Sequence, residues 1–502
     1  MGTWLSEREQ RLVEGAETAS AATPIPTQIV SNGEYLPPKQ SEIQKKVEHR
    51  LFEIAEANAK RLGLDRRQFL RTGCGMAAAF LAMREVYGTN AFQVEAAEAA
   101  EPELMLARAQ SLYGQFIFDD QTHFIRDDFN HKEILGLGDF AAEHWNPKLK
   151  DEGITLARYK FPNYIKEIFY DSDTSVSLLS GAPFDDPTWW LLSNEAIVKA
   201  RDVVNDFAGS RRMLAHTVIT PKQPGWMEEV DKAIAVYKPD SWKSYTIGDP
   251  LSPSKYPWRL DDEQVMYPFY EKAVKAGITT ICIHKGLLPP DYEKSFAGVW
   301  EYATCWDVGK AAKDWPKMNF VIYHSALRPF RELPDQALAE FEATGRITWT
   351  TDLAEIPQKF GVSNVYAEIG TSFANSAVAN PRFSAAFIGT LVKGMGADHV
   401  VWGTDSLWYG SPQWQIEAMR RLEIPEDMQK KYGFPALGGP NSATKQAIFG
   451  LNSTRIYGLK LKTAANTPMP EYSEDRLASV KAEYELAAKA PSNIRYGYVR
   501  TG

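Results

Sequence analysis

From about residue 112 onward, short apolar runs alternate with longer stretches whose apolar residues recur at helical spacing. Short apolar runs bounded by turn residues are typical of buried strands, and the periodic stretches between them are typical of amphipathic helices. Eight such runs occur, at residues 114–120, 174–183, 211–221, 241–249, 278–286, 318–326, 363–373 and 398–408. Alternating strands and helices predict a parallel sheet of the α/β class, and eight repeats favour a (β/α)8 TIM-like barrel over an open sheet.

The two ends of the chain lack this alternation. Residues 1–111 combine Pro-rich loop sequence with helical stretches, including an amphipathic helix expected over residues 41–63 and ended by Gly63. Residues 462–502 form a polar tail with one helical stretch. We therefore expect an N-terminal arm (1–111), a barrel (112–461) and a C-terminal tail (462–502). Such an arm buries little surface alone, so it is expected to pack on the barrel or to hold a homo- or hetero-oligomer together.

Composition narrows the class of protein. The 502 residues are 44% hydrophobic and 24% charged, which is ordinary globular composition. A net charge of -8 provides no basic stripe for nucleic acid. Three widely spaced cysteines form no disulfide framework, which is typical of a reduced, cytoplasmic protein. No run approaches the roughly 20 apolar residues that span a bilayer.

One segment suggests a different location. Residues 64–83 carry paired arginines, then Phe-Leu, then an apolar run of small residues, and they resemble a twin-arginine export signal. A very long stretch precedes the arginines, and Arg84 interrupts the apolar run. The segment is interpreted as a helix that resembles such a signal, and export is the alternative to a cytoplasmic location.

Polar residues stand at the carboxyl ends of several predicted strands, where a barrel enzyme carries its active site. They are Gln121 and His123 after the first, His284 at the fifth, His324 at the sixth and Asp405 at the eighth. Strand alternation sets Asp119, Gln121 and His123 on one face. Imidazoles and a carboxylate from separate strands suit a divalent metal, and a hydrogen-bond network of satisfied core residues is the alternative.

The segments FDDQTH (118–123), ICIHKG (281–286), VIYHSA (321–326), VWGTDSLW (401–408) and KQAIFGLNSTRIYGL (445–459) resemble the amidohydrolase superfamily. The likeness is greatest to the amidohydrolase-related branch that includes the aminocarboxymuconate semialdehyde and resorcylate-type decarboxylases. It spans about residues 112–460 and implies a metal-bearing (β/α)8 barrel. The motif Asp-x-His-x-His of the first strand has Gln121 where His or Glu is expected. The resemblance implies Gln121, His123, His284, His324 and Asp405 as metal ligands, with Asp405 and His324 as catalytic groups. An amide is a weaker donor than His or Glu, so we expect Gln121 to be a labile ligand, to hold a metal-bound water, or to indicate a harder ion such as Mn²⁺ or Fe²⁺ rather than Zn²⁺.

The resemblance implies roles for further residues. Members with two ions often carry a carboxylated lysine on the fourth strand, which is the position of Lys243, and an ion pair with Asp405 or contact with a substrate carboxylate is the alternative. His216 and Glu368 could help to hold a second ion, or else His216 fills the barrel interior and Glu368 orients an imidazole. One or two divalent ions are therefore expected. Arg328 and Trp408 are expected to contact a small-molecule substrate, with a surface ion pair as the alternative role of Arg328.

Three functions follow from these residues. The leading hypothesis is a metal-dependent hydrolase or non-oxidative decarboxylase for a small carboxylated organic molecule, with Asp405 as general base. A few members of the superfamily use a dinuclear iron or iron/manganese centre to hydroxylate amino acids with O2, so the resemblance implies such an oxygenase as an alternative. The remaining alternative is an inactive subunit that supports an active partner in a hetero-oligomer, with Gln121 as a sign of a decayed site.

Overall fold

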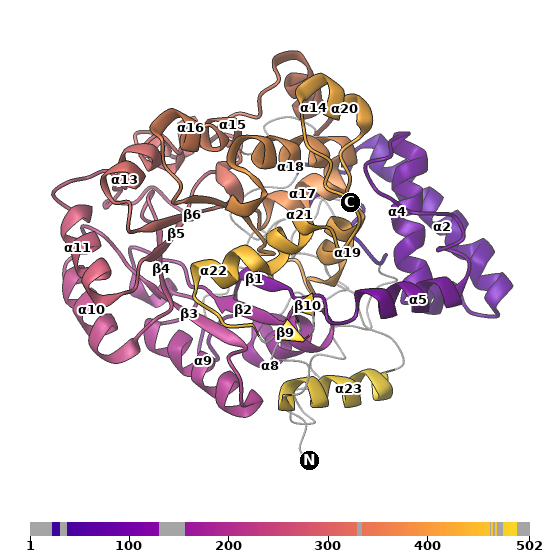
Figure 1. The fold of residues 1–502 in the computed structure, drawn as a ribbon, viewed down its shortest axis with the longest axis horizontal. Helices are drawn as coiled ribbons and strands as arrows, with labels where there is room; N and C mark the ends of the chain where they lie inside the picture. Colours follow the sequence, from indigo (N-terminus) through magenta and orange to yellow (C-terminus); the bar gives the residue numbers. More distant parts are fainter. Residues whose placement is uncertain are drawn as a thin grey trace.

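The computed structural model describes residues 23–30, 38–129, 156–328, 334–461, 463–464, 467–468 and 475–488. Eight parallel strands lie in its centre and pair in chain order, β1 to β8 (Figure 1). They are β1 (Phe118–Thr122), β2 (Val176–Leu179), β3 (Met213–Val218), β4 (Ser241–Tyr245), β5 (Thr280–His284), β6 (Asn319–Tyr323), β7 (Val365–Glu368) and β8 (Val400–Val401). The segment after β8 returns to β1 through backbone hydrogen bonds from Asp120 to Trp402 and from Asp405 to Gln121, both 2.9 Å long. The expected (β/α)8 barrel is confirmed.

Helices surround the strands, as the alternating pattern predicts (Figure 1). Those around the barrel are α8 (Phe161–Ile165), α9 (Asn194–Ala208), α10 (Trp226–Lys232), α11 (Met266–Ala276), α12 (Tyr292–Ser295), α13 (Val308–Asp314), α14 (Pro334–Thr344), α15 (Thr350–Ala354), α16 (Ile356–Phe360), α17 (Ser372–Ala379), α18 (Pro381–Met395), α19 (Gln413–Arg421), α20 (Glu426–Tyr432), α21 (Ala443–Gln446) and α22 (Asn452–Ile456). A short hairpin, β9 (Thr463–Ala464) and β10 (Thr467–Pro468), and the helix α23 (Arg476–Ala488) follow.

Side chains fill the interior of the barrel, so its floor is closed. Beneath the middle of the strands, Tyr457 stacks on Phe118 with ring centroids 5.3 Å apart. Two buried clusters form this floor, one of Phe116, Phe118, Val176, Leu178, Leu214, Tyr457 and Leu459 and one of Cys282, Val321, Tyr323, Tyr366 and Val401. Access to the interior is thereby limited to the carboxyl ends of the strands.

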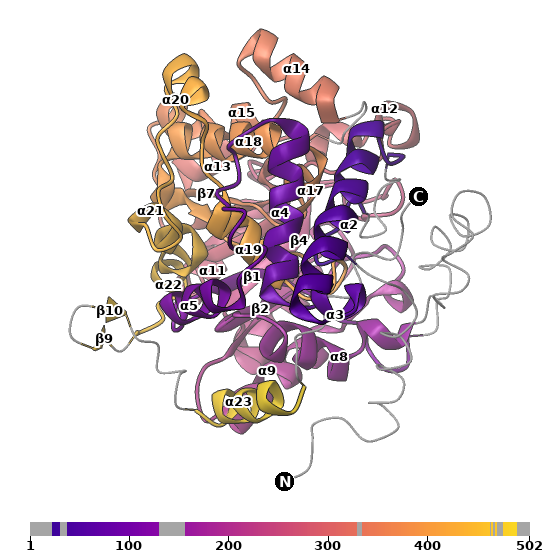
Figure 2. The same cartoon turned by 90° about the vertical axis from the view of Figure 1, so that its right-hand side faces the viewer.

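The helical N-terminal region expected from the sequence is present and lies against one side of the barrel (Figures 1 and 2). It comprises α2 (Glu42–Leu62), α3 (Arg66–Leu70), α4 (Gly73–Tyr87) and α5 (Pro102–Leu112). A capping box between Ser41 and Gln44 begins α2, and Gly63 ends it in the left-handed conformation at φ 67°. The export-like segment forms α3 and α4, and every residue from Cys74 to Met83 is buried. No helix among the described residues is long and apolar enough to cross a membrane.

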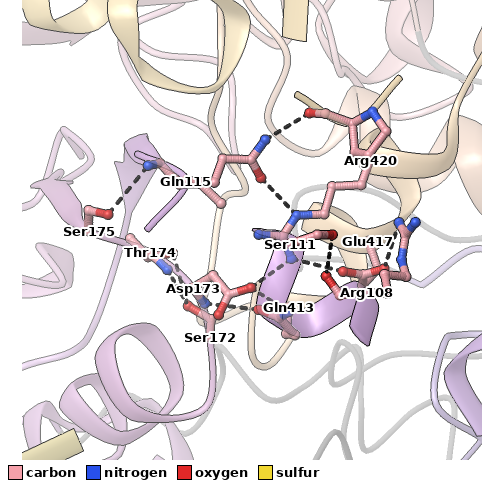
Figure 3. A network of polar contacts seen from close by, with 12 residues as sticks. Arg108, Ser111, Gln115, Ser172, Asp173, Thr174, Ser175, Gln413, Glu417 and Arg420 are labelled. Carbon is pink, nitrogen blue, oxygen red and sulfur yellow. Dashed lines mark hydrogen bonds and ion pairs between the residues drawn. The ribbon is translucent and has the colours of Figure 1, made fainter. Parts of the chain in front are cut away.

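A polar network joins these helices to the barrel (Figure 3). Arg420 of α19 donates from Nε to Gln115 (2.8 Å) and from Nη1 to both Asp173 (2.7 Å) and Glu417 (2.8 Å). Glu417 also accepts from Arg108 of α5 at 3.4 Å. A buried arginine needs carboxylate partners at hydrogen-bond distance, because a buried charge without a partner would destabilise the protein. The network therefore joins α5 to α19 and to the segment that precedes β2.

Candidate active site at the carboxyl ends of the strands

The polar residues predicted at the strand ends meet in one buried cluster. Gln121, His123, His284, His324 and Asp405 are each at most 3% exposed. His284 is the last residue of β5, and His324 follows β6 directly. Separate parallel strands thus deliver their side chains to the same end of the barrel, as the fold dictates.

The backbone is strained where these side chains emerge. His324, Ser325, Ala326, Thr371 and Asp405 all have positive φ, between 49° and 62°, although none is glycine. Each such residue costs on the order of 1–3 kcal/mol unless the surroundings impose the conformation. Strain of this kind concentrates at functional sites, and here it lies at the ends of β6, β7 and β8.

Strand β1 departs from simple alternation next to the cluster. Its register with β2 shifts between Asp119 and Thr122. Asp119, which alternation predicts beside Gln121 and His123, instead accepts hydrogen bonds from the backbone N–H of Thr404 (3.0 Å) and from its hydroxyl. A local irregularity that redirects side chains is common next to active sites, and it frees Gln121 and His123 to face Asp405.

Four polar groups have closely similar separations. The Nε2 atom of Gln121 lies 3.0 Å from Asp405 Oδ1, 3.4 Å from His123 Nε2 and 3.5 Å from His324 Nε2. His123 Nε2 also lies 3.0 Å from Asp405 Oδ1. Ligands bound about 2.1 Å from one ion are separated by about these distances, in tetrahedral or octahedral geometry.

Backbone carbonyls fix the two imidazoles. His123 Nδ1 faces the carbonyl oxygen of Ser180 at 3.0 Å, and His324 Nδ1 faces that of Gly370 at 2.9 Å. A carbonyl only accepts, so both Nδ1 atoms carry hydrogen and both Nε2 atoms face the cluster. Burial lowers the pKa of His324 to about 4, which leaves its Nε2 as a lone pair at neutral pH. Metal-binding imidazoles are commonly oriented in this way.

Asp405 is the negative group of the cluster. Burial alone would raise its pKa, but the hydrogen bond and charge of His123 and the nearby His324 lower it overall. Thr371 donates from its hydroxyl to Asp405 Oδ2 at 2.5 Å. The carboxylate is therefore ionised and held by donors on two sides, which suits a ligand or a charge partner.

Lys243, His216 and Glu368 lie deeper or to the side. Lys243 Nζ sits 3.6 Å from the centroid of the Tyr323 ring, and its charge helps to lower the pKa of His216, His284 and His324, for which burial is the main cause. His216 Nε2 lies 3.5 Å from the Tyr323 hydroxyl. Lys243 thus supplies positive charge to the interior.

Glu368 has a structural task. Its two oxygens accept from the backbone N–H groups of His324 (3.0 Å) and Gly370 (2.5 Å). Burial raises the pKa of Glu368 well above its usual value, although these two donors oppose the rise. Its carboxyl group therefore joins the ends of β6 and β7 and places His324.

The two predicted substrate contacts lie apart from one another. Trp408 is buried beside the cluster, with its ring centroid 6.1 Å from that of His123. Arg328 pairs with Glu340 of α14 at 3.4 Å and is partly exposed. The structure thus brings Trp408 to the site, and it engages Arg328 in the surface ion pair that the sequence offered as its alternative role.

Several groups at the site carried no sequence signal. Thr371 and the carbonyls of Ser180 and Gly370 hold the ionisable side chains, and Tyr245 stacks on His284 with centroids 4.2 Å apart. Carbonyls are present at every residue, so only the fold reveals which of them orient a histidine. Tyr245, the last residue of β4, could have been found by reading that strand end.

The side chains of the cluster offer ligands to a divalent ion when the Gln121 amide is included. No three His, Cys, Asp or Glu side chains of the described residues are placed to hold an ion by themselves. The amide of Gln121 completes the set of four convergent groups, and its Oε1 is buried with no hydrogen-bond partner among the described residues. Two imidazoles, a carboxylate and an amide oxygen together fit Mn²⁺ or Fe²⁺.

Comparison with known proteins supports the expected resemblance over part of the chain. Residues 248–459 match the family model described as amidohydrolase. This range contains His284, His324 and Asp405 but neither Gln121 nor His123. Among curated proteins, none matches the chain.

Solved structures with a similar barrel are distant from it. An uncharacterised TIM-barrel protein from Bordetella bronchiseptica is 12% identical, with 68% of this chain and 98% of that protein covered and a TM-score of 0.44. The 2,6-dihydroxybenzoate decarboxylase from Rhizobium is 14% identical, with 69% and 99% covered and a TM-score of 0.40. The 4-oxalomesaconate hydratase from Rhodopseudomonas palustris is 18% identical, with 74% and 100% covered and a TM-score of 0.38. Likenesses this distant leave the reaction open.

Proposed function

This chain is related to the amidohydrolases through residues 248–459, and on that basis we propose that it is a metal-dependent enzyme acting on a small carboxylated organic molecule. The observation that carries the proposal is the convergence of Gln121, His123, His324 and Asp405, with separations of 3.0–3.5 Å between their polar atoms. Burying so many polar groups is costly, and a catalytic site is a common reason for that cost.

These four residues would hold one divalent ion, with His284 at the neighbouring strand end as a further donor. A bound ion supplies a Lewis acid that draws electron density from the oxygens of the substrate. Lys243 adds a fixed positive charge to the interior, so the site favours an anionic substrate. Trp408 provides an apolar wall beside His123.

Of the two reactions left open by the sequence, we propose non-oxidative decarboxylation ahead of hydrolysis. Hydrolysis asks Asp405 to take a proton from water, and the lowered pKa of this carboxyl makes it a weak base near neutral pH. In decarboxylation the bond between the carboxylate carbon and its neighbour breaks, CO2 leaves, and the electron pair stays on the remaining carbon. That carbon then takes a proton from solvent, because Asp405 is ionised and His324 is neutral in this cluster, so that a carboxylate and a proton become CO2 and the decarboxylated product.

Product analysis tests this proposal. Purified protein loaded with Mn²⁺ would be incubated with a panel of hydroxybenzoates and short unsaturated dicarboxylates, and with esters and amides of the same acids, and CO2 and acid products would be measured. Release of CO2 in equal amount to the decarboxylated product supports the proposal. Turnover of an ester or amide without CO2 release would favour hydrolysis, and the absence of ion binding would refute the metal-dependent site.

A further inference from the structure

Gln121 lies among the polar groups of the cluster with its amide nitrogen turned toward them. Its Nε2 atom lies 3.0 Å from Asp405 Oδ1 and 3.5 Å from His324 Nε2. A carboxylate oxygen of Asp405 is an acceptor, and His324 presents a lone pair because its Nδ1 hydrogen faces Gly370. Both neighbours therefore accept hydrogen bonds, and only the N–H2 end of the amide can face them when no cation lies between.

The opposite end of the amide is poorly satisfied in this orientation. Oε1 of Gln121 is buried and has no hydrogen-bond partner among the described residues. It faces the space beside Gly370, where an added Cβ would lie 2.7 Å from this oxygen and 2.5 Å from Oε1 of Glu368. Both oxygens occupy the room left by the missing side chain, and Oε1 of Glu368 already accepts the N–H of Gly370 at 2.5 Å.

A half-turn of the Gln121 amide exchanges the places of its oxygen and its N–H2 group. The oxygen then faces Asp405 and the two histidines, which is favourable only when a cation is present. The N–H2 end takes the place beside Gly370, where it faces the acceptor Oε1 of Glu368. The amide exchanges its two ends about one side-chain bond, so the change requires no displacement of β1.

We propose that Gln121 is a two-position element of this site: its N–H2 end stabilises the ion-free cluster, and its carbonyl oxygen turns inward to bind a divalent ion. The inference rests on the proposed metal site and adds to it how the ion is retained. Each ion that enters must displace the hydrogen bond from Gln121 to Asp405, so the ion is bound reversibly and the ion-free protein stays folded.

Two substitutions at this position separate the two roles. Gln121→Glu keeps an oxygen ligand and removes the inward N–H, so the introduced carboxylate and Asp405 repel each other without an ion. Gln121→Leu removes both the oxygen ligand and the inward N–H donor. Gln415→Glu is the matched control, because Gln415 is also a fully buried glutamine with an unpartnered Oε1, but its Nε2 donates to the carbonyl of Thr404 (3.1 Å).

The test compares melting temperatures of chelator-treated protein and Mn²⁺-loaded protein, together with Mn²⁺ affinity from calorimetry. Both Gln121 variants are expected to melt below the wild type without ion. Gln121→Glu should then bind Mn²⁺ at least tenfold more tightly than wild type and regain its melting temperature, whereas Gln121→Leu should bind at least tenfold more weakly. Gln415→Glu should be destabilised equally with and without Mn²⁺.

The outcomes separate this inference from the proposed function. If the wild type binds Mn²⁺ but Gln121→Leu binds it equally well, the amide is no ligand and the inference is overturned alone. If chelator-treated Gln121→Glu has the same melting temperature as the chelator-treated wild type, the stabilising role of the inward N–H2 group is overturned. If neither wild type nor Gln121→Glu binds Mn²⁺, Fe²⁺ or Zn²⁺, the metal-dependent function falls with it.

Discussion

The buried ion pair behind His284 provides a quantitative test of how the site is held in place. Lys285 follows His284 at the end of β5, and its Nζ lies 2.9 and 3.0 Å from the two oxygens of Asp307. The Lys285 and Asp307 side chains are 0% and 3% exposed. Nζ also donates to the carbonyl of Tyr302 at 2.8 Å, and Asp307 accepts from the N–H of Leu260 at 2.9 Å.

We expect Asp307→Ala to destabilise the protein by about 3–5 kcal/mol, because it leaves the Lys285 charge buried without its carboxylate. Burial already lowers the pKa of Lys285, and Asp307 is the main group that opposes this. The double variant Lys285→Met/Asp307→Leu removes both charges and should cost less than Asp307→Ala alone. Its remaining loss is the acceptor for Leu260 N–H, about 1–3 kcal/mol.

The measurement is urea denaturation, followed by tryptophan fluorescence, of Asp307→Ala and of a double-mutant cycle that consists of Lys285→Met, Asp307→Leu and their double variant. Asp231→Ala is the matched control, since Asp231 pairs with Lys272 at the surface and should cost at most about 1 kcal/mol. If Asp307→Ala loses as little unfolding free energy as Asp231→Ala, the expected cost of an unpaired Lys285 charge is refuted. A double variant whose loss equals the sum of the two single losses would also refute the reasoning, because coupled partners are not additive.

Three further predictions concern the cluster and its surroundings. His284→Ala or Asp405→Ala should abolish activity and bound metal while circular dichroism shows an intact barrel; a variant that keeps both would refute the site. Lys243→Met should raise KM for the carboxylated substrate at least tenfold with little change in kcat, as steady-state kinetics would show, because it removes a buried positive charge. Burial lowers the pKa of Lys445 to about 8, below its unfolded value, so the folded state bears a cost of about 3 kcal/mol at pH 7 that fades between pH 8 and about 10.5. Lys445→Met should therefore melt above the wild type at pH 7 and lose that advantage by pH 10, and an advantage that grows with pH would contradict this sign.

Periodicity was sufficient for the fold because every strand is short, apolar and followed by a helix. The run at residues 278–286 contains β5, and the helix expected over residues 41–63 is α2 with its caps at Ser41 and Gly63. The export-like segment was harder to interpret. Its apolar residues are buried all round α4, because α2 packs along this helix at the side of the barrel (Figure 1).

The site was only partly predictable. Strand ends gave His284, His324 and Asp405, since a barrel brings such positions together. Alternation predicts Asp119 on one face with Gln121 and His123, but it does not predict the hydrogen bonds that Asp119 accepts from Thr404, because Thr404 is far away in the chain. The interaction of Thr371 with Asp405 joins two loops far apart in the chain, and no local pattern predicts it.

The central claim is that Gln121, His123, His324 and Asp405 surround one divalent ion. Crystals of the protein soaked in Mn²⁺ and measured at the manganese absorption edge would locate it most directly. The account predicts one anomalous peak about 2.0–2.3 Å from Asp405 Oδ1 and His324 Nε2, with the Gln121 amide oxygen turned toward it. A peak elsewhere in the molecule, or none at this cluster in protein that decarboxylates its substrate, would contradict the account.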